Sequence, residues 1–118
     1  MAALAGRKAR GMATQAGLAS YLREQIFPWA TDAGPGRAGQ DILNTPGLNI
    51  ECKARADFSP LAWLKQAESW HSDQGPPLAI AVWRPNGYGF ATIERWPAML
   101  RLGPLVATLR AAGYGEAP

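Results

Sequence analysis

Apolar and polar side chains alternate along residues 48–54, and a period of two is typical of a β-strand. The even positions carry Leu, Ile, Cys and Ala, whereas the odd positions from 49 to 55 carry Asn, Glu, Lys and Arg. We therefore expect a strand with one apolar and one charged face. A brief extended piece at residues 41–43 precedes it, and the Thr-Pro-Gly sequence at 45–47 predicts a tight turn between the two.

Three further segments have helical signals. Apolar side chains four residues apart predict a helix from about Met12 to Phe27, which Pro28 ends. A Ser-Pro pair supplies an N-cap and a first-turn proline for a helix over residues 60–72. A Gly-Pro pair opens a last helix over residues 103–113, and its final glycine stops it.

The remaining segments complete a sheet. Residues 78–83 form a nearly continuous apolar run, which predicts a central strand covered on both faces. The turn at 85–87 suggests that residues 88–93 return as an antiparallel hairpin partner, while 98–102 fits either a strand or a helical turn. Residues 29–40 are glycine-rich and predict a loop with at most a short strand at its start. The order of elements predicts an α/β fold with a central mixed β-sheet flanked by helices.

Composition limits the class of protein. The chain has 118 residues, 47% of them apolar, which is enough for one core, so we expect a single domain over residues 12–118 after a basic flexible arm at 1–11. No apolar stretch approaches the length of a membrane span, and the N-terminal segment lacks the apolar core of a secretion signal. Cys52 is the single cysteine, so no internal disulfide can form, and we expect a cytoplasmic protein. Because Cys52 falls on the apolar face of its strand, its pattern favours packing over nucleophilic chemistry.

The distribution of charge suggests a polyanionic partner. The formal net charge is +3, yet four of the nine acidic residues fall between positions 32 and 57. An acidic cluster within a basic protein is suited to a metal site that faces a phosphate backbone. Chance clustering of acids on a solvated surface is the alternative.

Asp41, Glu51 and Lys53 are the residues that suggest catalysis. Glu51 and Lys53 project from one face of the predicted strand, roughly 7 Å apart along it. The turn before the strand can bring Asp41 alongside, and two neighbouring carboxylates favour a divalent cation, Mg²⁺ or Mn²⁺. Such a cation polarises a phosphoryl oxygen and activates water, while the lysine assists the attack; the backbone carbonyl of Cys52 is a further candidate ligand. The alternative is an outward-facing Glu and Lys pair on a solvated sheet.

The ordered context of these residues resembles a known superfamily. A first helix and a glycine-rich loop are followed by Gly39-Gln40-Asp41-Ile42, a turn, Ile50-Glu51-Cys52-Lys53, and a helix that begins Pro60-Leu61-Ala62-Trp63. The arrangement is similar to the PD-(D/E)XK nucleases and, more narrowly, to small phage-encoded proteins that resemble archaeal Holliday junction resolvases. The similarity covers most of the chain.

This resemblance implies a restriction-endonuclease-like core and Mg²⁺-dependent endonuclease activity on branched or duplex DNA. The role of that activity is left open between DNA recombination, degradation of host DNA and processing of replicated phage DNA. The resemblance also implies a homodimer, in a bacterial or phage-infected cell. Asp41, Glu51 and Lys53 occupy the motif positions. The resolvase-like branch has a metal-reaching glutamate in its first helix, where this chain has Gln15, which could serve as a weak ligand.

Further residues are assigned supporting roles. Gln66 lies on the helix after the motif, where related nucleases place a polar residue near the scissile phosphate; an exposed helix position is the alternative. Basic side chains outside the motif are candidate DNA contacts. They are Arg7, Lys8, Arg10, Arg37, Arg55 and Lys65.

Two other functions remain open from the sequence. Gln15 in place of an acid is compatible with a catalytically silent DNA-binding module on the same scaffold. An unrelated α/β interaction protein, with Glu51 and Lys53 as a surface pair, is the other. Metal binding and DNA affinity at low salt distinguish the three functions.

Overall fold

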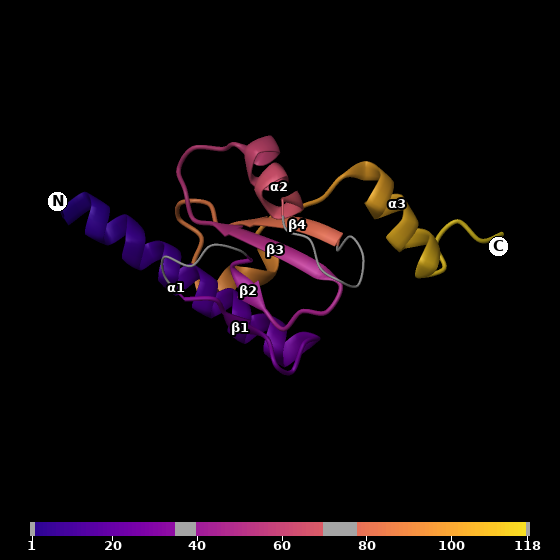
Figure 1. The fold of residues 1–118 in the computed structure, drawn as a ribbon, viewed down its shortest axis with the longest axis horizontal. Coiled ribbons are helices and arrows are strands. Elements are labelled where there is room, and N and C mark those ends of the chain that lie inside the picture. Colours follow the sequence, from indigo (N-terminus) through magenta and orange to yellow (C-terminus); the bar gives the residue numbers. More distant parts are fainter. Residues whose placement is uncertain (1, 35–39, 70–77, 118) are drawn as a thin grey trace.

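The computed structural model describes residues 2–34, 40–69 and 78–117 and, within these ranges, all side chains except those of residues 2–5 and 7. Figure 1 shows the chain as a ribbon. In chain order the elements are helix α1 (Ala2–Gln25), strands β1 (Thr31–Asp32), β2 (Ile42–Leu43) and β3 (Leu48–Lys53), helix α2 (Pro60–Glu68), strand β4 (Leu78–Trp83), the 3-10 helix η1 (Phe90–Arg95), strand β5 (Ala98–Met99) and helix α3 (Leu102–Ala111). None of the helices in the described residues has the length and apolar character needed to span a membrane.

Strand β4 is the centre of a mixed three-stranded sheet. It pairs in parallel with β3, from Leu48 opposite Leu78 to Lys53 opposite Trp83, and antiparallel with the short β5. Strands β1 and β2 form a separate antiparallel ribbon. This ribbon adjoins the free edge of β3, where the Asp41 N–H donates to the Ile50 carbonyl at 3.2 Å. The predicted α/β fold with a mixed sheet and flanking helices is confirmed at this level.

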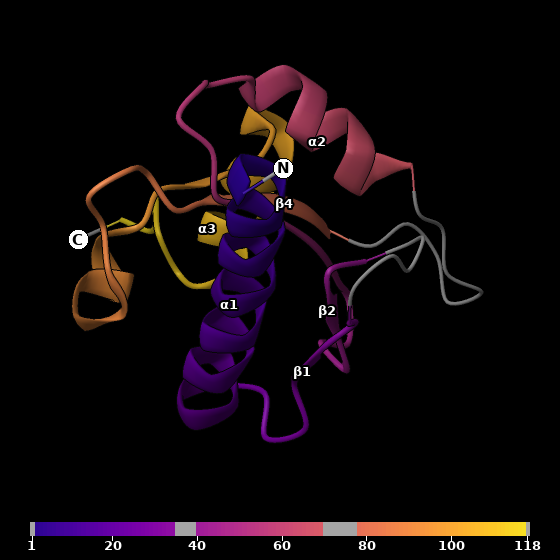
Figure 2. The same cartoon turned by 90° about the vertical axis from the view of Figure 1, so that its left-hand side faces the viewer.

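Helices cover the two faces of the sheet. Figures 1 and 2 show α2 on one side and α1 on the other. On the α1 side, Leu18 and Ala19 of the helix belong to the same buried cluster as Ile50 and Cys52 of β3. A second buried cluster lies on the α2 side and consists of Trp63, Leu64 and Ala81. The odd-numbered residues of β3 therefore face the α2 side, and Cys52 packs in the core as its position predicts.

Helix α1 begins earlier than the pattern of apolar residues indicates. It starts at Ala2 instead of Met12, so the expected arm at 1–11 is helical from residue 2 onward. The segment is rich in Ala, Arg and Lys, which have high helix propensity, and propensity leaves no trace in hydrophobic periodicity. The helix ends at Gln25, before Pro28, as predicted. Its N-terminal half extends beyond the sheet (Figure 1).

The predicted hairpin partner of β4 is wrong. Residues 88–93 do not return as a strand, because Phe90–Arg95 form η1, and the antiparallel partner of β4 is β5. Aromatic packing explains this: the Phe90 ring lies against Gly17 of α1, at a position that a side-chain carbon on this glycine would occupy. Trp96, at the end of η1, is buried at 6% exposure. Packing of Phe90 on α1 and burial of Trp96 in the core direct this segment away from the edge of the sheet.

Helix α3 lies apart from the other elements (Figure 1). It spans Leu102–Ala111 and ends two residues before Gly113, whose φ of 96° is the left-handed conformation that closes many helices. None of its residues is buried, and Leu102 is 73% exposed. The predicted last helix is therefore confirmed, whereas its apolar face contributes nothing to the core.

Candidate active site

The polar face of β3 is buried. Asn49 and Glu51 are only 1% and 2% exposed, because α2 covers this face of the sheet. Lys53, at the end of the strand, remains partly accessible, with 16% of its side chain exposed. The solvated surface pair that the sequence left open is thus not what the fold contains. A buried carboxylate is rare in proteins and needs a partner, which makes this strand the chemically distinctive part of the molecule.

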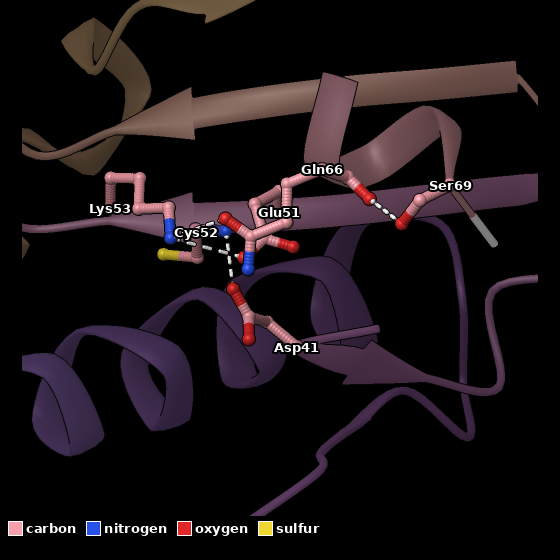
Figure 3. A network of polar contacts seen from close by, with 6 residues as sticks. All are labelled: Asp41, Glu51, Cys52, Lys53, Gln66 and Ser69. Atoms are coloured by element: carbon pink, nitrogen blue, oxygen red, sulfur yellow. Dashed lines mark hydrogen bonds and ion pairs between the residues drawn. The ribbon is translucent and has the colours of Figure 1, made fainter. Parts of the chain in front are cut away.

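Asp41 reaches the same strand from the ribbon. Its carboxylate oxygen Oδ2 accepts a hydrogen bond of 2.7 Å from the backbone N–H of Cys52 (Figure 3). Its own N–H donates to Ile50, so residue 41 adjoins β3 through both backbone and side chain. The turn at 45–47 brings Asp41 alongside Glu51, as the sequence predicts.

Lys53 links the strand to α2. Its Nζ lies 3.2 Å from Glu51 Oε1 and donates a hydrogen bond of 2.9 Å to Gln66 Oε1. Figure 3 shows the Gln66 side chain pointing from α2 towards this ammonium. Gln66 lies in the last turn of α2. The Ser69 hydroxyl donates a hydrogen bond of 2.6 Å to the Gln66 carbonyl and so stabilises this end of the helix. The structure therefore brings four predicted residues together, and Gln66 contacts the lysine directly.

Burial raises the pKa of both carboxyl groups. Desolvation by burial, together with the charge of Asp41, raises the pKa of Glu51 to about 7, although the charge of Lys53 opposes the change. Desolvation also raises the pKa of Asp41, against the lowering effect of the Cys52 N–H. Burial likewise raises the pKa of the Cys52 thiol, which keeps this sulfur protonated and unsuited to nucleophilic attack.

The site offers oxygen groups of the kind that a small divalent cation binds. Glu51 Oε2 is buried without a hydrogen-bond partner among the described residues, and Asp41 Oδ1 is not used in the hydrogen bond to Cys52. The Cys52 carbonyl points to the same edge of β3 as its N–H, since both groups of one residue lie on one side of a strand. Two carboxylates and a carbonyl are hard oxygen ligands, and Mg²⁺ takes few protein ligands and keeps several waters. The described residues contain no cluster of three or more His, Cys, Asp or Glu side chains, so these two acids would be the anionic ligands.

Two amide side chains extend the buried polar face, and the sequence pattern did not identify them as part of the site. Gln40 Nε2 donates to Asn49 Oδ1, and Asn49 Nδ2 donates to the Ala67 carbonyl of α2 at 3.1 Å. They fix the residue before Asp41 and the helix that carries Gln66. The signal was available for Asn49, because it shares the period of Glu51 and Lys53.

Arg84 was also missed, and it joins α1 to the end of β4. Its Nη1 donates to the buried Thr14 hydroxyl at 3.0 Å and its Nε to the Tyr88 carbonyl at 2.7 Å. The guanidinium lies 4.5 Å from the centroid of the Phe90 ring. Desolvation by burial, together with the charge of Arg10, lowers the pKa of Arg84. A lone arginine after a strand carries no sequence signal for this structural role.

The other predicted residues lie around the site. Gln15 is half-buried on α1 and does not belong to the network in Figure 3. Lys8, Arg10 and Arg55 line a pocket together with Lys53. The remaining candidates are more distant or outside the description: Lys65 is exposed on α2, the Arg7 backbone lies in α1 although its side chain is not described, and Arg37 falls outside the described residues.

Comparison of the chain with models of protein families, with curated proteins and with solved structures gives no match. A function for this site must therefore be argued from its own geometry. The decisive features are the two converging carboxylates, the unpaired oxygen of Glu51 and the lysine held beside it.

Proposed function

We propose that this protein is a metal-dependent endodeoxyribonuclease with a restriction-endonuclease-like core of the PD-(D/E)XK type. One observation carries the proposal. Asp41, Glu51 and Lys53 meet in a covered site in which a buried carboxylate oxygen, Glu51 Oε2, has no hydrogen-bond partner among the described residues. An unpaired buried carboxylate oxygen is costly in free energy unless a cation or a proton occupies it.

Each residue has a role in phosphodiester hydrolysis. Asp41 and Glu51 would hold Mg²⁺, or Mn²⁺ in its place, with the Cys52 carbonyl as a third ligand. The cation supplies Lewis-acid activation of a phosphate oxygen and of water. Asp41 is oriented for this by its hydrogen bond to Cys52, before any ligand is present.

Lys53 provides the positive charge on the substrate side. Its ammonium bridges Glu51 and Gln66, so it is positioned to orient the attacking water or to neutralise charge that develops on the phosphate. Gln66 acts as a positioning residue, because it contacts the lysine. If Glu51 bound a cation, the contact between Glu51 and Lys53 would be lost. Lys53 would then keep its hydrogen bond to Gln66, and its ammonium could face the phosphate.

The proposed substrate is DNA, cut with selectivity for structure over sequence. The net charge of +3 and the basic side chains beside Lys53 support attraction to a phosphate backbone. A homodimer that cuts two strands, acting in the bacterial or phage-infected cytoplasm, remains a prediction; sedimentation equilibrium would test the dimer.

Cleavage assays with purified protein test this function. Labelled four-way junction, flap and linear duplex DNA are incubated with Mg²⁺, Mn²⁺ or EDTA. Cutting that requires metal and is lost in Glu51→Gln and Lys53→Met is the expected result. Glu68→Gln is a matched control, because Glu68 forms an exposed ion pair with Arg101 at 3.0 Å, on the same helix as Gln66.

The outcomes separate the candidate functions. Binding of DNA without cutting under every metal condition would replace the enzyme with the silent DNA-binding module, a reading that Gln15 in place of an acid also permits. Absence of both DNA binding at low salt and metal binding would refute a nucleic-acid function and leave an interaction protein.

A further inference from the structure

A pocket adjoins the site where β3 ends. It has a volume of about 870 Å³ and lies between α1, which contributes Lys8, Arg10 and Gly11, and the chain from Cys52 to Asp57. The C-terminal ends of parallel strands are where α/β folds commonly bind ligands. Lys53 belongs to both the pocket and the candidate active site, so whatever occupies the pocket lies next to the reacting centre.

The pocket is strongly cationic. Lys8, Arg10, Lys53 and Arg55 line it against the single acid Asp57. Arg10 is held by a 3.2 Å hydrogen bond from Nη2 to the Pro85 carbonyl. A guanidinium held in place and surrounded by further cations is suited to a phosphate group.

The size and surroundings favour a single strand over a duplex. A volume of this order holds a drug-sized ligand, which corresponds to about one or two nucleotides. Phe58 follows the lining residue Asp57 in the chain, does not itself line the pocket, and is 55% exposed. Its ring lies 4.7 Å from the ring of Trp83, so one side is supported and much of the remainder is open. Basic groups that follow a backbone, with a supported aromatic ring beside them, are typical of sites for single-stranded nucleic acid.

We propose that this pocket binds a single-stranded segment of nucleic acid next to the scissile phosphate, with Lys8, Arg10 and Arg55 on its phosphates and Phe58 stacked on a base. The inference rests on the proposed nuclease for its role, and it names the substrate class as DNA with a single-stranded arm. The pocket then selects branched DNA in which one strand is unpaired beside the cut.

Gly11 allows the pocket to be filled without removing a charge. A side-chain carbon at Gly11 or at Gly6 would meet no atom within 4 Å, yet only Gly11 lines the pocket. Gly11→Leu and Gly6→Leu are therefore a matched pair of substitutions in one helix. Fluorescence anisotropy in EDTA, with a labelled oligothymidylate and a duplex of equal length, measures binding independently of cleavage.

The expected result is at least about a tenfold loss of oligothymidylate affinity in Gly11→Leu, with Gly6→Leu unchanged. Phe58→Leu should weaken single-strand binding at least about fivefold. Arg55→Gln should lower both the affinity and its salt dependence, compared with Arg110→Gln on α3. Circular dichroism confirms that each variant is folded.

Failure of this proposal and failure of the nuclease are distinguishable. Wild-type affinity for oligothymidylate in Gly11→Leu and in Arg55→Gln, with metal-dependent cleavage intact in the wild type, would overturn the pocket proposal alone. Loss of single-strand affinity in Gly11→Leu, in a protein that cuts no DNA, would uphold the pocket and refute the nuclease.

Discussion

The Asp41 carboxylate is fixed to the backbone of Cys52 by a hydrogen bond of 2.7 Å, which joins the ribbon to the strand that carries Glu51. The oxygen Oδ2 thereby stabilises the fold, whereas the other carboxylate oxygen, Oδ1, is available to bind a cation in the proposed site. Structure and proposed function can be separated at this residue, because an amide can accept the same hydrogen bond without carrying the charge.

Asp41→Asn should therefore fold and lose metal. Its amide oxygen still accepts from the Cys52 N–H, while the loss of one anionic ligand weakens Mg²⁺ and Mn²⁺ binding at least about tenfold. Isothermal titration calorimetry with Mn²⁺ measures the affinity and thermal melting measures the fold. Asp32→Asn is the control, because Asp32 accepts a local hydrogen bond of 3.1 Å from Gly34 outside the site. Equal metal affinity in wild type and Asp41→Asn would refute the assigned ligand.

The raised pKa of Glu51 gives stability a dependence on pH. The folded-state pKa is about 7 against an ordinary value of 4.5, so between about pH 5 and 8 the unfolded chain releases a proton that the folded protein retains. Stability in EDTA should therefore fall as pH rises through this window. Glu51→Gln removes this dependence and should be more stable than wild type at pH 8, by on the order of 1–3 kcal/mol.

Urea unfolding at pH 5 and pH 8 measures the difference between wild type and Glu51→Gln, in which the other titrating groups largely cancel. Saturating Mg²⁺ should stabilise the wild type at pH 8 and leave Glu51→Gln unchanged, because a ligand stabilises only the state that binds it. A wild type whose stability relative to the variant is equal at the two pH values would contradict the burial of this acid.

The period of two along β3 predicts that Glu51 and Lys53 share one face, because alternation places them there whatever covers it; their assignment as site residues also needs the resemblance to the PD-(D/E)XK nucleases. The period could not show that the face is buried. That depends on α2, whose Ala67 and Gln66 contact residues 49 and 53 from 13 to 18 positions away in sequence. The mixed sheet was likewise predictable, since an apolar run such as residues 78–83 identifies a central strand.

Errors arose where contacts between distant segments decide the local structure. The segment after β4 has residues compatible with a strand, but packing of Phe90 against α1 and burial of Trp96 favour η1 instead. The pattern of apolar residues places the start of α1 too late, because periodicity reports the face that packs and not the full length of a helix.

Removal of the Gln66 acceptor should affect turnover more than binding. In Gln66→Met the side chain keeps its length while Lys53 loses its 2.9 Å partner, so the ammonium is less well positioned. We expect kcat to fall roughly tenfold, the scale of one hydrogen bond to a charged group, with KM and Mn²⁺ affinity nearly unchanged. Single-turnover cleavage at saturating enzyme measures this, with Gln25→Met as the control on an exposed helix end. A change in KM alone would assign Gln66 to substrate binding.

Gly17 should be intolerant of a side chain, in contrast to Gly6 on the same helix. A Cβ at residue 17 would overlap the Phe90 ring, whereas at residue 6 it meets no atom within 4 Å. Gly6→Ala should therefore raise stability by about 0.5–1 kcal/mol through helix propensity. Gly17→Ala should lower it by about 1–3 kcal/mol, because the ring must leave its place against α1 and its contact with Arg84. Chemical unfolding of both variants measures the contrast.

A double-mutant cycle identifies the cause. In a Phe90→Ala background the obstructing ring is absent, so Gly17→Ala should cost nothing there and should show the small helical gain seen at Gly6. A cost that persists without the ring would place the conflict elsewhere on α1. A cost that disappears would establish that close contact between a glycine and an aromatic ring positions η1, and with it the support for Arg84 between α1 and the end of the central strand.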